Sequence, residues 1–152
     1  MTAAPFRYLL RVRYGECDAQ KIVYNARYGD YVDLAATEFL RAVWGNAMFG
    51  GGLDYRLVRY AIDWRRSPAR YDDVVAIAVT TARIGTTSFV LAADLRRHPD
   101  GDAIAAAETT YVLVGEADQA KRPIPDDHRR RLEEGARGLV VDHAGAGACQ
   151  TV

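Results

Sequence analysis

The chain has 152 residues, of which 49% are hydrophobic, and its 20 basic and 20 acidic residues give a formal net charge of zero. This length and composition predict one domain with a substantial core and exclude an overall disordered chain. The zero net charge gives no bulk support to non-specific nucleic-acid binding, so we expect no nucleic-acid partner.

The first predicted elements are a strand and a long helix. Between Tyr8 and Tyr14 apolar and basic residues alternate, which is typical of a half-buried strand. From Tyr28 to Trp44 the apolar residues recur at three- and four-residue steps, which predicts an amphipathic helix. Asn25 is a candidate N-cap of this helix, and Gly45 is a residue type that commonly ends a helix.

Four strand-like runs and a short helix follow. The strands are predicted at Tyr55–Arg66, Val74–Ile84, Thr86–His98 and Ala103–Val114, and the helix at Asp126–Glu134. Short connections between the runs favour an antiparallel meander. We therefore expect one domain over residues 1–134 and a flexible Gly- and Ala-rich tail over residues 135–152.

One helix cannot cover both faces of a five-stranded sheet. The uncovered surface and the open edges favour pairing with a second copy, so a homodimer is the minimal expectation.

The segment before the long helix carries the candidate chemistry. Asp18 lies in a loop just before the expected helix N-terminus, where backbone amides lack partners and the helix dipole favours negative charge. An acid in this position can act on a carbonyl whose oxygen those amides hold. The layout indicates acyl transfer to water, although an acid that caps a turn or pairs with Arg27 is the alternative.

Other chemistries find little support in the sequence. The two serines, Ser67 and Ser88, lie outside any Gly-x-Ser-x-Gly motif. The three histidines are scattered without metal spacing, and the two cysteines form no disulfide framework. No apolar run resembles a signal peptide or is long enough to span a bilayer, so we expect a soluble cytoplasmic protein without a metal.

Three motifs together resemble the hot-dog family of 4-hydroxybenzoyl-CoA and YbgC-like acyl-CoA thioesterases over roughly residues 6–134. The first runs from Tyr14 through Glu16-Cys17-Asp18 to Ile22-Val23-Tyr24 and Tyr28. The second is Ile84-Gly85-Thr86-Thr87-Ser88-Phe89, and the third is Lys121-Arg122-Pro123-Ile124-Pro125.

The resemblance implies an α+β fold in which a curved, antiparallel five-stranded sheet wraps a long central helix. It also implies that two protomers join edge to edge, with active sites between them, and that dimers often pair again into tetramers. Asp18 takes the position of the catalytic carboxylate, and Tyr14 matches an aromatic residue that some relatives use beside it. Lys21 stands where the family usually has Gly, and Asn25 where YbgC-like enzymes have His.

These expectations give each candidate residue a role. Asp18 is the nucleophile or general base, and the amide of Tyr24 or of a neighbour is the candidate donor to the carbonyl oxygen. Tyr28 is expected near the acyl pocket. Asn25 is expected as an N-cap or a substrate contact, and Thr87 and Ser88 as strand residues or contacts near the thioester.

The substrate is expected to be an acyl-CoA, with coenzyme A as part of the substrate and no separate cofactor. The candidate contacts for the CoA phosphates are Arg65, Arg66, Arg70, Arg83, Lys121 and Arg122. An acyl-ACP thioesterase and a non-catalytic acyl-CoA binding protein remain alternatives.

Overall fold

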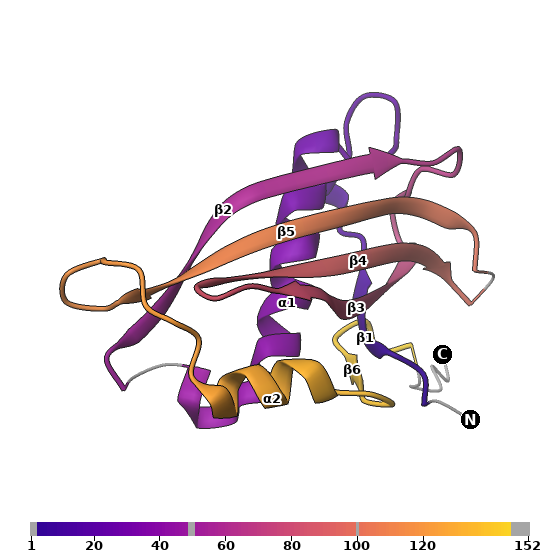
Figure 1. Cartoon of the computed structure of the whole chain (residues 1–152). Helices are drawn as coiled ribbons and strands as arrows, with labels where there is room; N and C mark the ends of the chain where they lie inside the picture. Colours follow the sequence, from indigo (N-terminus) through magenta and orange to yellow (C-terminus); the bar gives the residue numbers. More distant parts are fainter. Residues whose placement is uncertain (1–2, 49–50, 100, 147–152) are drawn as a thin grey trace.

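The structure is a computed structural model, and it describes residues 3–48, 51–99 and 101–146. Figure 1 shows a sheet with one long helix against it and a shorter helix at one end. The elements within the described residues are β1 (Phe6–Arg11), α1 (Tyr28–Trp44), β2 (Leu53–Trp64), β3 (Val74–Ile84), β4 (Ser88–His98), β5 (Ala103–Gly115), α2 (Asp126–Glu134) and β6 (Val140–Asp142).

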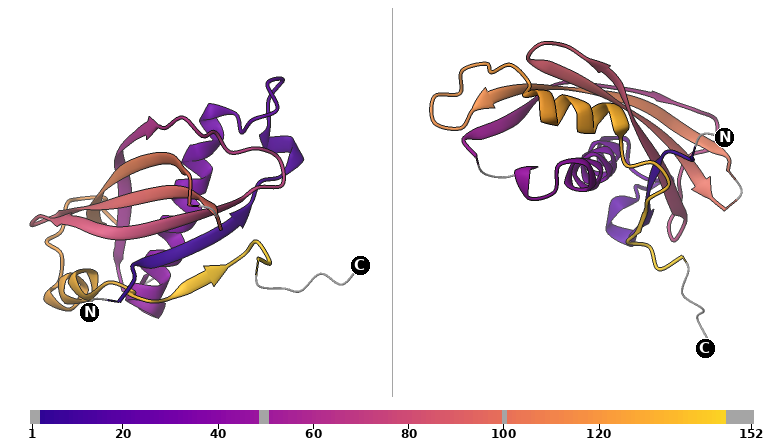
Figure 2. Two further views of the ribbon diagram at one scale, coloured as in Figure 1. Left: turned by 90° about the vertical axis from the view of Figure 1, so that its right-hand side faces the viewer. Right: turned by 60° about the horizontal axis from the view of Figure 1, so that its bottom comes forward.

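The strands form one curved sheet in the order β2-β5-β4-β3-β1-β6. All neighbours are antiparallel except β1 and β6, which run parallel. In the right-hand view of Figure 2 the sheet arches over α1, which is seen nearly end on. The expected α+β architecture of a helix wrapped by a curved sheet is confirmed.

The helix α1 forms where the three- and four-residue apolar spacing predicts it, from Tyr28 to Trp44. Its apolar stripe is buried against the inner face of the sheet, and Ala35 and Leu40 are completely inaccessible. Gly45 ends the helix with a positive φ of 56°, and its amide donates to the carbonyl of Arg41. The core therefore lies between this stripe and residues such as Ile77 and Leu91 of the sheet.

Strand β2 is an open edge of the sheet. A bulge between Leu57 and Arg59 sets Val58 outside the regular pairing with β5, and the Val58 side chain is 59% exposed. Beyond the bulge, Tyr60 lies close to Gly29 at the start of α1. A long edge strand with exposed apolar side chains is a template for pairing with another chain.

The segment expected to be a flexible tail differs from that expectation. Val140–Asp142 forms β6 and adds a sixth, parallel strand beside β1. The amide of Arg7 donates to the carbonyl of Leu139, and the Tyr8 hydroxyl lies 3.0 Å from Nδ1 of His143. The expectation of a tail is therefore wrong for β6, while residues 147–152 lie outside the described residues.

Among the described residues no helix covers the outer face of the sheet. It holds a hollow of about 640 Å³, lined by small residues including Ala78, Ala92 and Ala106 and rimmed by charged ones. This matches the expectation that a single long helix leaves one face open.

No helix in the described part of the chain combines the length and apolar character that crossing a bilayer requires.

Candidate active site

The loop that carries Asp18 is closed by its own backbone. The Asp18 amide donates to the carbonyl of Ile22, and the Lys21 amide donates back to the carbonyl of Asp18, both at 2.9 Å. This tight turn requires a left-handed residue, and Lys21 takes a φ of 63° at the position where the family usually has Gly. The lysine therefore adopts the glycine-like backbone itself.

Glu16 anchors this loop to the long helix. Its carboxylate is 5% exposed and accepts hydrogen bonds from the Arg13 backbone amide, the Arg13 guanidinium and the Tyr31 hydroxyl. Burial alone raises the pKa of the carboxyl, but these bonds outweigh burial and hold the pKa below its usual value. Burial and the adjacent carboxylate raise the pKa of Tyr31, which keeps its hydroxyl a donor.

The Asp18 carboxylate is partly engaged and partly open. Its Oδ1 accepts the Gln20 amide at 2.8 Å, which is the bond of a turn-capping acid. The alternative pairing with Arg27 is not seen, because Arg27 instead lies 3.2 Å from Asp30. Among the described residues Oδ2 has no hydrogen-bond partner, and Asp18 lines two separate cavities.

The start of the helix differs in detail from the sequence expectation. Asn25–Arg27 forms a 3₁₀ turn that leads into α1, and the Asn25 side chain makes no capping bond, so its prediction as N-cap is wrong. The Tyr24 amide is also not a free donor, because it donates to the carbonyl of Glu16 at 2.9 Å. Within the described chain the amides of Asn25 and Ala26 have no hydrogen-bond acceptor, so the unpaired donors are the neighbours of Tyr24.

The first cavity contains both Asp18 and Asn25. It has a volume of about 340 Å³ and is lined by Asp18, Gln20, Ile22, Val23, Asn25, Tyr28, Trp64, Arg65 and Pro68. Tyr28 is buried, its hydroxyl accepts the Ala69 amide, and its ring meets the Trp64 ring edge to face at 6.1 Å. The structure thus brings four of the predicted site residues to one cavity with mostly apolar walls: Asp18, Asn25, Tyr28 and Arg65.

A second cavity lies against another side of Asp18. It measures about 600 Å³ and is lined by Tyr14, Gly15, Cys17, Asp18, Ala19, Lys21 and Tyr71. The Tyr14 side chain is 80% exposed and meets Tyr71 edge to face at 6.0 Å. Tyr14 is therefore a surface aromatic beside the carboxylate loop, in a 3₁₀ turn after β1 rather than in the strand.

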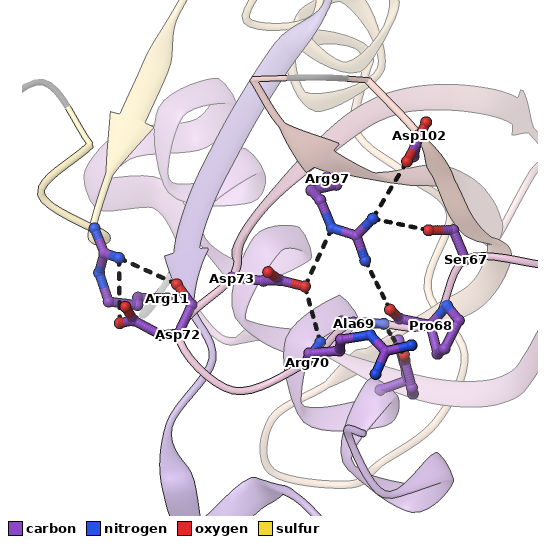
Figure 3. Close-up of polar contacts among 10 residues, drawn as sticks. Arg11, Ser67, Pro68, Ala69, Arg70, Asp72, Asp73, Arg97 and Asp102 are labelled. Atoms are coloured by element: carbon purple, nitrogen blue, oxygen red, sulfur yellow. Dashed lines mark hydrogen bonds and ion pairs between the residues drawn. The ribbon is translucent and has the colours of Figure 1, made fainter. Parts of the chain in front are cut away.

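A third and larger cavity, of about 850 Å³, adjoins the first. It is lined by Trp64, Arg65, Arg66, Ser67, Pro68, Arg70, Arg97, Asp102 and Ala103, so three of the predicted phosphate contacts meet here. Figure 3 shows how Arg97 from β4 spreads its guanidinium to Asp73, Ser67, Pro68 and Asp102. Arg97 thereby fixes the loop between β2 and β3.

The remaining candidates lie at the other end of the sheet. Ser88 pairs with Val112 on β5, whereas Trp64 pairs with Ala105, seven residues away along the same strand. At about 3.3 Å per residue this separation is roughly 23 Å. Other residues at the far end are Arg83, Thr87, Lys121 and Arg122, with Arg83 paired to Val90 and Lys121 bridged to Val114. One protomer alone therefore does not bring them to Asp18.

Sequence reasoning missed Trp64, Pro68, Tyr71 and Arg97 as parts of the site and gave Glu16 no role. Trp64 and Pro68 each line both the first and the third cavity. An aromatic residue followed directly by two arginines and a Ser-Pro turn was an available signal for a ligand site at a strand end. Arg97 was missed because three of its partners, Ser67, Pro68 and Asp73, come from the distant loop between β2 and β3, and only Asp102 is near it in sequence.

Within the described ranges no three His, Cys, Asp or Glu side chains are grouped so as to hold an ion.

Comparisons with known proteins identify the family of the chain. The family model of the thioesterase-like superfamily matches residues 12–132. A protein of Aquifex aeolicus named "Putative esterase" is 30% identical over 112 residues, which make up 72% of this chain and 85% of that protein.

Solved structures give the same fold. A 1,4-dihydroxy-2-naphthoyl-CoA thioesterase from Synechocystis superimposes with a TM-score of 0.74 at 20% identity, over 85% of this chain and 96% of that one. A thioesterase superfamily protein from Jannaschia sp. CCS1 gives a TM-score of 0.79 at 22% identity, over 86% and 92% of the two chains. The chain therefore belongs to the thioesterase-like superfamily, and it is a thioester hydrolase with the hot-dog fold.

Proposed function

We propose that the chain hydrolyses an acyl thioester at Asp18, with the carbonyl oxygen held by the amides of Asn25 and Ala26. The observation that supports this is the cavity of about 340 Å³ that Asp18 and Asn25 line together. Ala26 is the next residue along the chain, and a carboxylate and unpaired backbone donors are the two groups that acyl transfer requires.

The electrostatics at this place suit a developing negative charge. The N-terminal end of a helix carries about half a positive charge, concentrated on its unpaired amides. A preorganised donor of this kind contributes roughly a hundred- to thousandfold in rate. Because the Tyr24 amide donates to the carbonyl of Glu16, the unpaired donors available to the substrate carbonyl oxygen are the amides of Asn25 and Ala26.

Two routes use the same groups. In the first, Oδ2 of Asp18 attacks the carbonyl carbon, the C–S bond breaks with release of the thiolate, and water then hydrolyses the mixed anhydride. In the second, Asp18 takes a proton from water, which attacks the carbonyl directly. Label from ¹⁸O-water found in Asp18 after a single turnover identifies the first route, because it requires hydrolysis of the anhydride at the aspartyl carbonyl. If only the product acid is labelled, both routes are consistent with the result, and trapping of the anhydride with hydroxylamine then identifies the first route.

The proposal is tested with the variant Asp18→Asn. We expect a fall in kcat of about a thousandfold or more in a free-thiol assay across a panel of acyl thioesters, because an amide neither attacks nor accepts the proton. The matched control is Asp30→Asn, an exposed acid in the first turn of α1, which should retain activity. Hydrolysis at the wild-type rate by folded Asp18→Asn would reject the role of Asp18.

The complete site includes a second copy of the chain. The exposed apolar side chains on the β2 edge, Leu57, Val58, Tyr60 and Trp64, favour antiparallel pairing of two β2 strands about a two-fold axis. Such pairing sets the Trp64 end of one β2 beside the Leu53 end of the other. Thr87, Ser88, Lys121 and Arg122 of the second copy, which lie at the Leu53 end of the sheet, would then approach the Asp18 cavity.

A further inference from the structure

The second cavity, of about 600 Å³, takes no part in the hydrolysis as described above. Among the described residues Asp18 is the lining residue that it shares with the first cavity, and it shares none with the third. Its volume lies in the range of ligand sites. A thioester whose carbonyl lies at Asp18 can therefore extend its thiol side through the first cavity and its acyl group into the second.

Lys21 supplies the positive charge of the second cavity. Its side chain is exposed and has no hydrogen bond or ion pair to another described residue. Asp18 lines the same cavity, but its Oδ1 accepts the Gln20 amide. Burial and the carboxylates of Glu16 and Asp18 raise the pKa of the Cys17 thiol, which therefore stays uncharged at neutral pH. The Lys21 ammonium is thus left to bind an anionic group of a ligand.

Two tyrosine rings form an apolar wall of this cavity. Tyr14 and Tyr71 are 80% and 58% exposed, and their rings meet edge to face at 6.0 Å. Neither hydroxyl has a hydrogen-bond partner in the described part of the chain. Exposed aromatic rings beside an unpaired cation favour a ligand that is apolar along its length and negatively charged at its end.

The segments that carry the two rings are joined before any ligand binds. The Val12 amide donates to the carbonyl of Asp73 at 2.9 Å, and the Asp72 amide donates to the carbonyl of Val12 at 3.1 Å. The ion pair between Arg11 and Asp72, drawn in Figure 3, joins the same two segments. This bracing lowers the cost of ordering the wall on binding.

We propose that the second cavity is the acyl subsite, and that it selects acyl groups with a carboxylate at the end remote from the thioester, which the Lys21 ammonium binds beside Tyr14 and Tyr71. The inference rests on the proposed hydrolysis at Asp18. A terminal carboxylate pairs with the ammonium, whereas an uncharged acyl end displaces water from it without replacing the lost hydrogen bonds.

Lys21 is a feature of this chain rather than of the family, which usually has Gly at this position. Its φ of 63° is a backbone angle that glycine adopts without strain and that a lysine adopts at a cost. The chain therefore has a strained residue whose side chain adds a charge to the cavity beside Asp18.

The first experiment varies the acyl group while the carrier is kept. kcat/KM is measured for the CoA esters of succinic, adipic and suberic acid, each paired with a neutral ester in which an isopropyl group replaces the carboxylate. We expect about a tenfold preference for the charged ester with the two longer acids. The preference should be smaller with succinic acid, because a short chain brings its carboxylate toward that of Asp18. Equal or lower kcat/KM for the charged ester in every pair would overturn the subsite while leaving hydrolysis at Asp18 intact.

The second experiment varies the protein. Lys21→Met keeps the length of the side chain and should abolish the preference for the charged ester, whereas Lys21→Arg should retain it and Lys21→Glu should reverse it. Arg7→Met is the matched control, because Arg7 is an exposed cation on β1 that lines none of the three cavities around Asp18. An unchanged preference in Lys21→Met, or its loss in Arg7→Met, would contradict the role of Lys21.

A binding measurement keeps the acyl subsite separate from the proposed hydrolysis. Thioether analogues of the adipic ester and of its neutral counterpart, in which a methylene group replaces the thioester carbonyl, are titrated into the wild type and into Lys21→Met. We expect the wild type to bind the charged analogue about tenfold more tightly than the neutral one, and Lys21→Met to bind both alike. This result, with the far-ultraviolet circular dichroism unchanged, would support the subsite even if no thioester is hydrolysed. Failure of the wild type to distinguish the two analogues would refute it.

Discussion

Lys21 shows how one backbone angle shapes the carboxylate loop. Its φ of 63° lies in the left-handed region, which costs a non-glycine residue on the order of 1 kcal/mol or more. The turn that it closes holds Asp18 in place through the bonds to Ile22 and Lys21. The loop therefore retains strain beside the group that is proposed to react.

Replacing Lys21 with glycine should relieve this strain. We expect Lys21→Gly to stabilise the protein by about 0.5–1 kcal/mol after the entropy of the unfolded chain is subtracted, which raises Tm by about 1–4 °C. Gln20→Gly is the neighbouring control, and it should lower Tm because Gln20 does not have a positive φ. A lower Tm for Lys21→Gly in a thermal melt would contradict the interpretation.

Glu16 links acid stability to the position of the loop. Its pKa is lowered in the folded protein, so the unfolded chain takes up a proton first as the pH falls. The stabilisation is therefore fully present above the ordinary value of 4.5 and is lost as the pH drops through the lowered pKa of the folded state.

The variant Glu16→Gln should be less stable by about 2–3 kcal/mol at pH 7, since it leaves buried partners imperfectly paired. The difference from the wild type should shrink as the pH is lowered from 5 toward 3 in urea unfolding experiments. Glu116→Gln, an exposed acid after β5, is the control and should follow the wild-type curve. A difference that stays constant over this pH range would show that the charge of Glu16 is not the cause.

At the scale of single residues, the sequence predicted which residues line the site better than it predicted their hydrogen-bond partners. Asp18, Asn25 and Tyr28 do meet at one cavity. Which amide is free, however, depends on the carbonyl of Glu16, and the gathering of Arg65, Arg66 and Arg70 depends on Arg97 from β4. Both depend on residues that approach from elsewhere in the chain, and local patterns carry no signal for them.

At the scale of elements, long periodic patterns were reliable and short ones were not. The predicted bounds of α1, β3 and α2 are confirmed at Tyr28–Trp44, Val74–Ile84 and Asp126–Glu134. Strand β2 runs from Leu53 to Trp64 rather than over the predicted Tyr55–Arg66, and a bulge sets Val58 outside its pairing with β5. Strand β6 has only three residues in a Gly- and Ala-rich stretch, and it exists through its pairing with β1, which the sequence does not reveal.

The attachment of β6 can be weakened at one hydroxyl. Tyr8→Phe removes the bond to His143 and should cost about 1 kcal/mol, or about 2–4 °C in Tm, with faster hydrogen exchange over residues 139–144. Tyr71→Phe is the control, because the Tyr71 hydroxyl has no hydrogen bond to another described residue. Unchanged exchange in Tyr8→Phe would mean that backbone pairing alone holds β6.

At the scale of the whole molecule, the two sheet edges differ. Strand β6 is short, whereas β2 is twelve residues long and exposes several large apolar side chains. Edge pairing through β2 predicts that hydrolysis requires the dimer, because Lys121 and Arg122 reach the site only from the second copy.

A lysine on β2 should separate the copies. For Val58→Lys we expect a monomer in light scattering and at least a tenfold loss of hydrolysis, because a buried, unpaired charge at the seam is costly. Val140→Lys makes the same change on the exposed opposite edge and should keep both the dimer and the activity. A Val58→Lys protein that remains a fully active dimer would refute pairing through this strand.

Asp18 lines two cavities, one with Tyr28 and Trp64 and the other with Tyr14 and Tyr71. If the thioester is hydrolysed at Asp18, the acid and the thiol can leave through different cavities. The acid and the thiol then need not leave in a fixed order, and each can inhibit independently of the other. Turnover would in that case be limited by whichever fragment departs more slowly, and enlarging one exit would accelerate the enzyme only for substrates whose slower fragment uses it.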